Sequence, residues 1–130
     1  MMTQINIVHS EQAPKAVGPY SQAVICNGVL YASGQIGLDS QTGKMIADDI
    51  EGQAAQVTRN LSAVLTEAGC SVGDILKVNI FLTDMSDFPR VNEIYAAWLG
   101  EHRPARATVA VAALPLGAKV EMDLLARAGQ

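Results

Sequence analysis

An arginine in the C-terminal third of the chain is the first residue that could do chemistry. Arg106 follows Pro104-Ala105 and opens an apolar segment, residues 107–111. An arginine at the mouth of an apolar strand is costly to bury without an anionic partner. Two interpretations are open: an ion pair with Glu121 or another carboxylate of the chain, or a clamp for the carboxylate of a substrate. The planar guanidinium suits the second role because it can donate two parallel hydrogen bonds.

Glu121 is the second candidate. It lies in a segment of alternating character in which Val120, Met122 and Leu124 are apolar. If those apolar residues face the helices, alternation directs Glu121 and Asp123 to the opposite side of the sheet. There Glu121 could orient a water molecule or act as a general acid or base. A solvated or ion-paired strand carboxylate is the ordinary alternative.

Two short segments could form the walls of a site. Residues 18–21 (Gly-Pro-Tyr-Ser) make a rigid corner that carries a phenol, and residues 33–37 (Ser-Gly-Gln-Ile-Gly) end a strand in small residues. A ligand or a neighbouring backbone can approach closely at such a strand end. The glycine spacing fits neither the Walker A motif nor the dinucleotide fingerprint. Ser33 has no Gly-x-Ser-x-Gly context, so a serine hydrolase is not indicated.

The elements that would position these residues form one domain over residues 1–130. The expected order is β-β-(β)-α-β-α-β-β, with one optional strand before the first helix. Strands are predicted over residues 21–26, 29–33, 75–83, 106–111 and 119–126, and helices over residues 50–68 and from an N-cap at Ser86 or Asp87 to Leu99. Asn27-Gly28 favours a type I′ turn between the first two strands. The fold class is therefore α+β, a two-layer sandwich with two helices on one face of a mixed sheet.

Alternation along the strands predicts a second, partly apolar sheet face. In the strand at 75–83 we expect Leu76, Val78, Ile80 and Leu82 to share one face and Lys77, Asn79 and Phe81 the other. Phe81, Val109 or Thr108, Ala110 and Leu125 cannot all meet the two helices. A partner subunit would cover such a face, so a homo-oligomer is predicted.

Composition argues against several functional classes. The net charge is −4 and no basic stripe exists, which argues against nucleic-acid binding. No apolar run reaches the roughly 18 residues of a membrane span, and the N-terminus does not resemble a signal peptide, so a cytoplasmic protein is expected. Cys26 and Cys70 stand apart, as do His9 and His102. Neither a disulfide nor a structural metal site is therefore predicted.

Taken together, these segments resemble the reactive intermediate deaminase (YjgF-type) family over nearly the whole chain. The most specific part is the C-terminal combination of Pro104-Ala105-Arg106, Leu114-Pro115 and Val120-Glu121-Met122. The resemblance implies a fold like that of trimeric chorismate mutase and a homotrimer with sites at its subunit interfaces. It also implies hydrolysis of 2-imino acids, such as 2-iminopropanoate and 2-iminobutanoate, to 2-keto acids and ammonia. The family requires no metal or organic cofactor for this reaction.

The resemblance also implies roles for single residues. Arg106 matches the arginine that binds the substrate carboxylate, and Glu121 matches the glutamate that positions the hydrolytic water. The remaining pocket residues are implied to be Tyr20, Ser33, Gly34 and Thr108.

The chain departs from the family pattern directly after the arginine. Ala107 stands where serine is common, and Thr108 stands where cysteine is common. If the backbone there makes the substrate contacts, hydrolysis survives the change, whereas a role that requires the thiol does not. Two other functions remain open: a module that binds 2-keto acids without turnover, and an RNA-directed endoribonuclease or translation inhibitor. The presence of Glu121 favours the enzyme.

Overall fold

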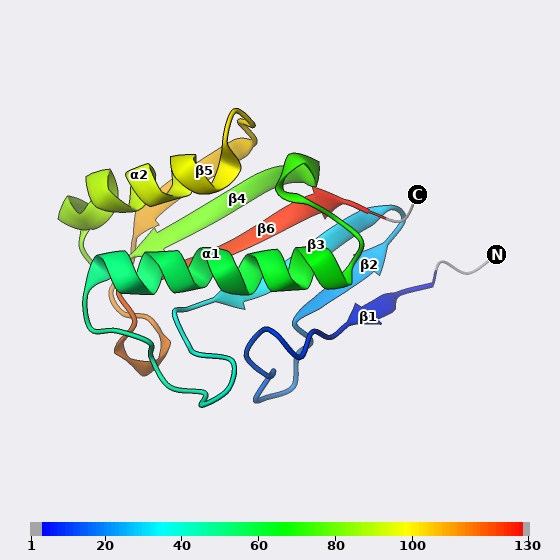
Figure 1. Ribbon diagram of the computed structural model, residues 1–130, viewed down its shortest axis with the longest axis horizontal. Coiled ribbons are helices and arrows are strands. Elements are labelled where there is room, and N and C mark those ends of the chain that lie inside the picture. Colours follow the sequence, from blue (N-terminus) through cyan, green and yellow to red (C-terminus); the bar gives the residue numbers. More distant parts are fainter. Residues whose placement is uncertain (1–3, 129–130) are drawn as a thin grey trace.

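The computed structural model describes residues 4–128 and shows a six-stranded sheet with two helices packed on one face (Figure 1). The strand order is β1-β2-β3-β6-β4-β5, and every neighbouring pair is antiparallel except β4 and β5, which are parallel. The strands are β1 Asn6–Val8, β2 Ala23–Cys26, β3 Val29–Gln35, β4 Ile75–Leu82, β5 Ala105–Ala110 and β6 Val120–Arg127. The helices are α1 Ile50–Glu67 and α2 Phe88–Leu99, with short 3-10 turns η1 Val72–Asp74, η2 Met85–Asp87 and η3 Pro115–Gly117. The predicted α+β sandwich with a mixed sheet is confirmed.

The first hairpin forms where the sequence predicted it. Asn27 and Gly28 have φ values of 52° and 76°, and Cys26 pairs with Val29 across the turn. The optional strand, however, was expected between this hairpin and the first helix, and that prediction is wrong. The segment before α1 holds only an isolated bridge between Leu38 and Met45, and the additional strand of the sheet is β1, before the hairpin, which the sequence did not predict. A three-residue strand is too short for alternation to reveal it.

Capping residues explain where α1 begins and ends. The Asp49 side chain accepts a hydrogen bond from the Gly52 amide at 2.6 Å, which satisfies a donor of the first turn. After the helix, Gly69 adopts a φ of 77°, the left-handed conformation that ends many helices. The predicted helix over residues 50–68 therefore agrees with the structure to within one residue.

The start of the second helix differs from the prediction in its capping side chain. Asp87 occupies the N-cap position of α2, but its side chain makes no capping hydrogen bond. Instead Asp84 accepts from the Ser86 amide and caps the preceding turn η2. The continuous turn into α2 removes the need for a side-chain cap at residue 87.

The face assignment in β4 is correct from Val78 onward and wrong for Leu76. Leu76 is 47% exposed, whereas Ile75 is 1% exposed. The pairing of β4 with β6 shifts register between Ile75 and Lys77. A bulge of this kind adds a residue to one strand and reverses the alternation on one side of it.

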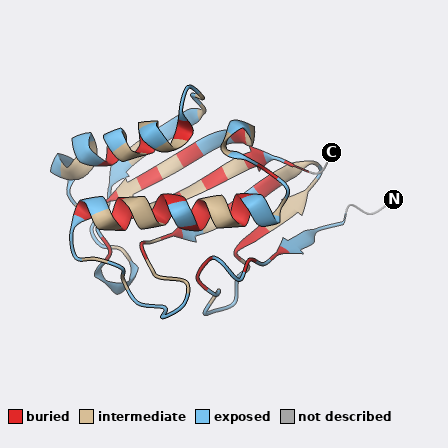
Figure 2. Ribbon diagram, viewed as in Figure 1, coloured by how far each residue is buried: buried red, intermediate tan, exposed pale blue. Residues whose placement is uncertain are grey.

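Buried residues recur along both helices and alternate along the central strands, which places the core between the helix layer and the sheet (Figure 2). The opposite sheet face is partly apolar, as predicted: Tyr31 and Val109 are 46% and 45% exposed, and Phe81 and Leu125 are half-buried. No helix within residues 4–128 is long and apolar enough to cross a membrane. The predicted cover of the second face by a partner subunit stays a prediction.

Candidate active site

A cavity of about 420 Å³ opens at the end of β3 and β6, and we call it the Glu121 pocket. Three loops form its walls, at residues 9–22, 36–49 and 111–119, and its floor includes Gly34 and Glu121. Tyr20 also lines it, so the structure brings together three of the residues that the sequence singled out.

Glu121 faces away from the helices, as alternation predicted, because its neighbours Val120 and Met122 are fully buried on the helix side. Partial burial raises the pKa of the Glu121 carboxyl, and the nearby negative charge of Asp123 raises it further. Among residues 4–128, none forms an ion pair with this carboxylate. A carboxyl group with a raised pKa, facing a cavity, is suited to accept a proton from water and to return it later.

Gly34 allows the Glu121 carboxylate to lie directly against the β3 backbone. A Cβ atom at residue 34 would overlap Oε2 of Glu121 and would lie 2.8 Å from its Cδ. The glycine is therefore required for close approach, which agrees with the strand end of small residues seen in the sequence.

Gly34→Ala is expected to lower kcat/KM by about 10- to 100-fold, because the added methyl group displaces the carboxylate from its position in the pocket. Global stability should change little, since the carboxylate can rotate toward the cavity. Steady-state kinetics and a thermal melt check this, and Gly73→Ala is the control, because a Cβ atom there would lie 3.7 Å from Ser71 Oγ, at an ordinary contact distance and outside the pocket. Unchanged kcat/KM in Gly34→Ala would show that the position of Glu121 is unimportant.

Tyr20 and Ser33 have different positions relative to this pocket. The Tyr20 ring is half exposed at the pocket wall. Ser33 is not part of the wall: its hydroxyl donates to the Ser21 carbonyl at 2.6 Å, and its amide donates to the Gln22 carbonyl at 2.9 Å. Ser33 thus ties β3 to the segment that follows Tyr20.

Arg106 lies in a different hollow, of about 480 Å³, which we call the Arg106 pocket. Its Nη1 donates to Oδ1 of Asn92 at 2.7 Å. The guanidinium carbon is 5.1 Å from the centroid of the Phe88 ring and 5.2 Å from that of Tyr95. These contacts hold the side chain against α2 by a hydrogen bond and two cation–π interactions.

Arg106 and Glu121 lie on opposite faces of the sheet. Arg106 pairs with fully buried Val78, which faces the helices, whereas Glu121 pairs with Phe81, which faces away from them. The interpretation of Arg106 as an ion-pair partner of Glu121 is therefore wrong, and none of the ion pairs within residues 4–128 includes Arg106. Its positive charge remains available to an external anion.

Thr108 shares the face of Arg106, because it pairs with the fully buried Ile80. Its hydroxyl oxygen is buried and has no hydrogen-bond partner in the described part of the chain, and the same holds for the hydroxyl of Tyr95. A buried hydroxyl without a partner is uncommon in folded proteins.

Sequence reasoning missed the part of α2 that surrounds Arg106. It gave Phe88, Asn92 and Tyr95 no role in a site. The spacing of Phe88, Asn92 and Tyr95 places them on one helix face, which is the signal that could have grouped them. Which strand they would meet depends on the parallel pairing of β4 and β5, and no local pattern reveals that pairing.

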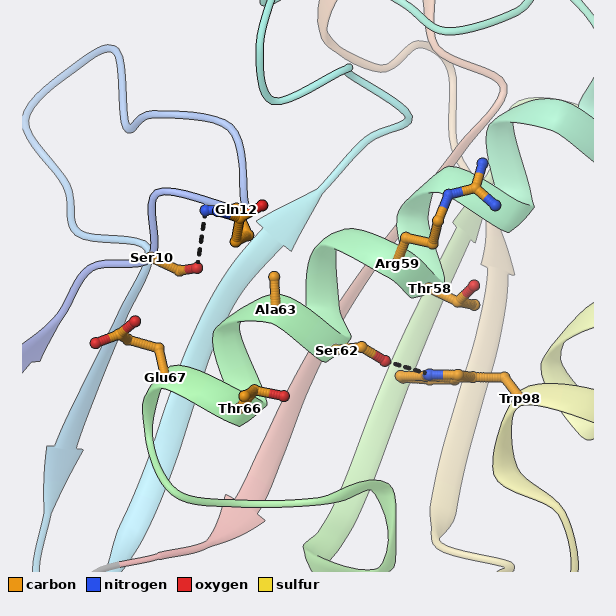
Figure 3. A pocket seen from close by; sticks show the side chains of 9 residues that line it. All are labelled: Ser10, Gln12, Thr58, Arg59, Ser62, Ala63, Thr66, Glu67 and Trp98. Carbon is orange, nitrogen blue, oxygen red and sulfur yellow. Dashed lines mark hydrogen bonds between the residues drawn. The ribbon is translucent and has the colours of Figure 1, made fainter.

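A third hollow, of about 470 Å³, lies on the outer side of α1 (Figure 3). It holds none of the predicted site residues. Trp98 Nε1 donates to the Ser62 hydroxyl at 2.8 Å, and the Gln12 amide donates to the Ser10 hydroxyl at 3.1 Å. Because these polar groups already have partners, we do not include this hollow in the site.

Comparison with known proteins supports the assignment of these features to one family. The model of the endoribonuclease L-PSP family matches residues 10–128. A mouse protein named 2-iminobutanoate/2-iminopropanoate deaminase is 42% identical over 123 residues, which are 95% of this chain and 91% of the mouse protein. The crystal structure of RidA from the Antarctic bacterium Psychrobacter has a TM-score of 0.91 at 43% identity, covering 94% of this chain and 98% of that one. Escherichia coli TdcF with bound serine has a TM-score of 0.90 at 39% identity, covering 95% of this chain and 99% of that one. The resemblance seen in the sequence is thus confirmed, and the chain belongs to the endoribonuclease L-PSP family, which includes the reactive intermediate deaminases.

Proposed function

We propose that this chain is an enzyme that hydrolyses 2-imino acids, such as 2-iminopropanoate and 2-iminobutanoate, to 2-keto acids and ammonia. The observation that carries the proposal is the guanidinium of Arg106, held by Asn92 and two aromatic rings but without a carboxylate partner among the described residues. This arrangement is a receptor for a small carboxylate. The name and similarity of the mouse deaminase support the choice of imine hydrolysis.

The two pockets provide the groups that this hydrolysis needs. Arg106 binds the substrate carboxylate and so fixes the orientation of the C=N bond. Glu121 accepts a proton from water as the water oxygen attacks the imine carbon. That proton then returns to the nitrogen and gives a neutral amino alcohol. As the C–N bond breaks, Glu121 takes the hydroxyl proton and passes it to the amine nitrogen, so that ammonia leaves and the carbonyl forms. The raised pKa of Glu121 suits it to both proton transfers.

We further propose that the complete site forms between subunits of a homotrimer. Two groups on opposite faces of one sheet cannot bind the same small molecule. If the β5 edge of one subunit meets the outer sheet face of the next, the Arg106 pocket of the first adjoins the Glu121 pocket of the second. Three such contacts close a ring. The exposed Tyr31 and Val109 on the outer sheet face support this arrangement.

Co-expression of the Arg106→Ala and Glu121→Gln variants tests the shared site. Each variant is expected to be inactive alone, but random mixing in a trimer gives about a quarter of the sites both wild-type halves. The mixed preparation should therefore recover about a quarter of wild-type activity, measured per site. Differently tagged subunits purified in two steps isolate the hybrids, in each of which one site in three is complete. Hybrids without activity would show that the two groups do not act in one site.

A second candidate function is binding of a 2-keto acid or amino acid without turnover, and the serine in the TdcF structure favours it. The two functions are separated by supplying imino acids from an L-amino acid oxidase in the presence of semicarbazide. A deaminase suppresses semicarbazone formation and a binding protein does not. Wild-type protein that leaves semicarbazone formation unchanged over several amino-acid precursors would exclude the proposed catalysis.

A further inference from the structure

We infer that three buried carboxamides, those of Gln22, Gln53 and Asn60, are positioning residues that hold the loops around the Glu121 pocket. Their kinetic role rests on the proposed function, whereas their role in ordering the loops does not. None of the three was singled out by the sequence.

The loops require such support because they contain little regular structure. Residues 9–22 contain no strand or helix, and residues 36–49 contain only the isolated bridge between Leu38 and Met45. Residues 111–119 contain only the turn η3. Backbone groups in such segments lack the partners that a sheet or helix supplies, so they need side chains or water instead.

Gln22, directly before β2, holds the first loop by four hydrogen bonds. Its Nε2 donates to the carbonyls of Ser10, Ala13 and Pro14 at 3.1, 3.4 and 2.8 Å. Its Oε1 accepts from the Ser10 amide at 2.6 Å. Gln22 itself and Pro14 line the Glu121 pocket, and the same loop carries the pocket residue Tyr20.

Asn60 holds the second loop from the middle of α1. Its Nδ2 donates to the carbonyls of Ile36 and Leu38 at 3.2 and 3.0 Å. Its Oδ1 accepts from Nε2 of Gln56 at 2.8 Å. Both Ile36 and Leu38 line the pocket.

Gln53 joins the second loop to the third. Its Nε2 donates to the Ala47 carbonyl at 3.1 Å, and its Oε1 accepts from the Lys119 amide at 2.8 Å. The second loop lies directly on α1 here, because a Cβ atom at Gly37 would be 2.9 Å from the Cα of Gln53. One side chain thus spans the end of the 36–49 loop and the segment that leads to Glu121.

Because these three amide side chains are almost fully buried, they do not contribute to the solubility of the protein. Gln22, Gln53 and Asn60 are 2%, 3% and 1% exposed. A buried amide is unfavourable unless its donors and acceptors are bonded, and apolar side chains of similar size would suit the core as well. The backbone groups of the loops are the groups that the amides satisfy.

Amide hydrogen exchange of the wild-type protein gives the first test. The Ser10 and Lys119 amides donate to Gln22 and Gln53, so we expect both to exchange slowly, at rates like those of the neighbouring strands. The Gln12 amide, which donates to the Ser10 hydroxyl in the same loop, is the control and should exchange much faster. Fast exchange of the Ser10 and Lys119 amides would overturn the proposal without any variant.

Gln22→Met gives the second test, because it keeps the size of the side chain and removes all four hydrogen bonds. Exchange across residues 10–20 should rise by at least about tenfold. If the first loop is ordered in only a minor fraction of the Gln22→Met molecules, KM should rise by a similar factor while kcat stays close to the wild-type value. A general loss of folded protein would instead lower kcat and leave KM unchanged.

Thr58→Val is the matched control, since Thr58 is a buried residue of α1 whose hydroxyl donates to the Ala55 carbonyl away from the Glu121 pocket. Its melting temperature should fall, but exchange in residues 10–20 and KM should match the wild type. A Gln22→Met protein with wild-type exchange and wild-type KM would overturn the positioning role. If the wild type has no deaminase activity, the proposed function fails, while the exchange data still decide whether the amides order the loops.

Discussion

Arg106→Ala is expected to lower kcat/KM for 2-imino acids on the order of 10²–10³-fold, since a preorganised charged donor to the substrate is lost. The guanidinium already has its orientation from Asn92, Phe88 and Tyr95, so the substrate carboxylate does not have to order it. The assay is ammonia and keto-acid release from imino acids generated by an L-amino acid oxidase, with semicarbazide as the trap. Stability should change little, because the arginine side chain lies at the surface of α2.

Two control variants distinguish carboxylate binding from a general effect of charge. Arg106→Lys keeps the positive charge but loses the planar donor pair, so its kcat/KM should lie between those of wild type and Arg106→Ala. Arg103→Ala removes a second arginine of the same pocket, whose guanidinium donates to the carbonyls of Gly100 and His102. We expect its kcat/KM to stay close to the wild-type value. Equal losses in the Arg103 and Arg106 variants would indicate a nonspecific electrostatic effect rather than a clamp.

The parts of the fold that the sequence predicted well have local causes. The hairpin at residues 27–28 needs two positive φ values, and the Asn-Gly dipeptide accepts both. The helix α1 has an aspartate cap at one end and Gly69 at the other, so its limits depend on neighbouring residues alone. The side of the sheet that Glu121 faces also followed from local alternation along β6.

The parts that it could not predict depend on how distant segments pair. Leu76 points outward because β4 shifts register against β6, and this partner strand lies more than forty residues away. The face of Arg106 depends on the parallel pairing of β4 with β5. The sequence alone therefore cannot decide between an internal ion pair of Arg106 and an external clamp, because the decision depends on the register that places Glu121 on the other face.

Buried polar residues were the other omission. Gln22 and Asn60 look like ordinary polar positions in the sequence, yet both are almost fully buried. Their partners are backbone carbonyls 8 to 24 positions away. Hydrophobic periodicity carries no information about such contacts, because it reports only which face of an element is apolar.

Glu121→Gln is expected to abolish most activity while it raises stability at neutral pH. The amide cannot accept a proton from water, so kcat should fall on the order of 10²–10⁴-fold. Burial and Asp123 raise the pKa of the Glu121 carboxyl, which means that the folded state binds its proton more tightly than the unfolded state does. Above the raised pKa, the ionised carboxylate therefore lowers the stability of the wild type, and glutamine removes this cost.

The sign of the pH dependence follows from the same shift. The difference in melting temperature between Glu121→Gln and wild type should be positive at neutral pH. It should shrink as the pH falls through the raised pKa, and vanish below the ordinary glutamate value of about 4.3. Thermal melts over this range check it. A difference that stays constant with pH would contradict a raised pKa at this residue.

The Asp123→Asn variant separates the two causes of the raised pKa of Glu121, which are burial and the charge of Asp123. The Asp123 carboxylate accepts a hydrogen bond from Asn79 Nδ2 at 2.8 Å. Burial is the larger cause of the raised pKa of Glu121, and the negative charge of Asp123 is the smaller one. Asparagine can keep the contact with Asn79 while it removes the charge. The acid limb of the kcat/KM profile, which reports the ionisation of Glu121 in the free enzyme, should then move to lower pH with little change in the plateau. An acid limb that does not move in Asp123→Asn and disappears in Glu121→Gln would assign the whole shift to burial. An acid limb that persists in Glu121→Gln would mean that another group accepts the proton.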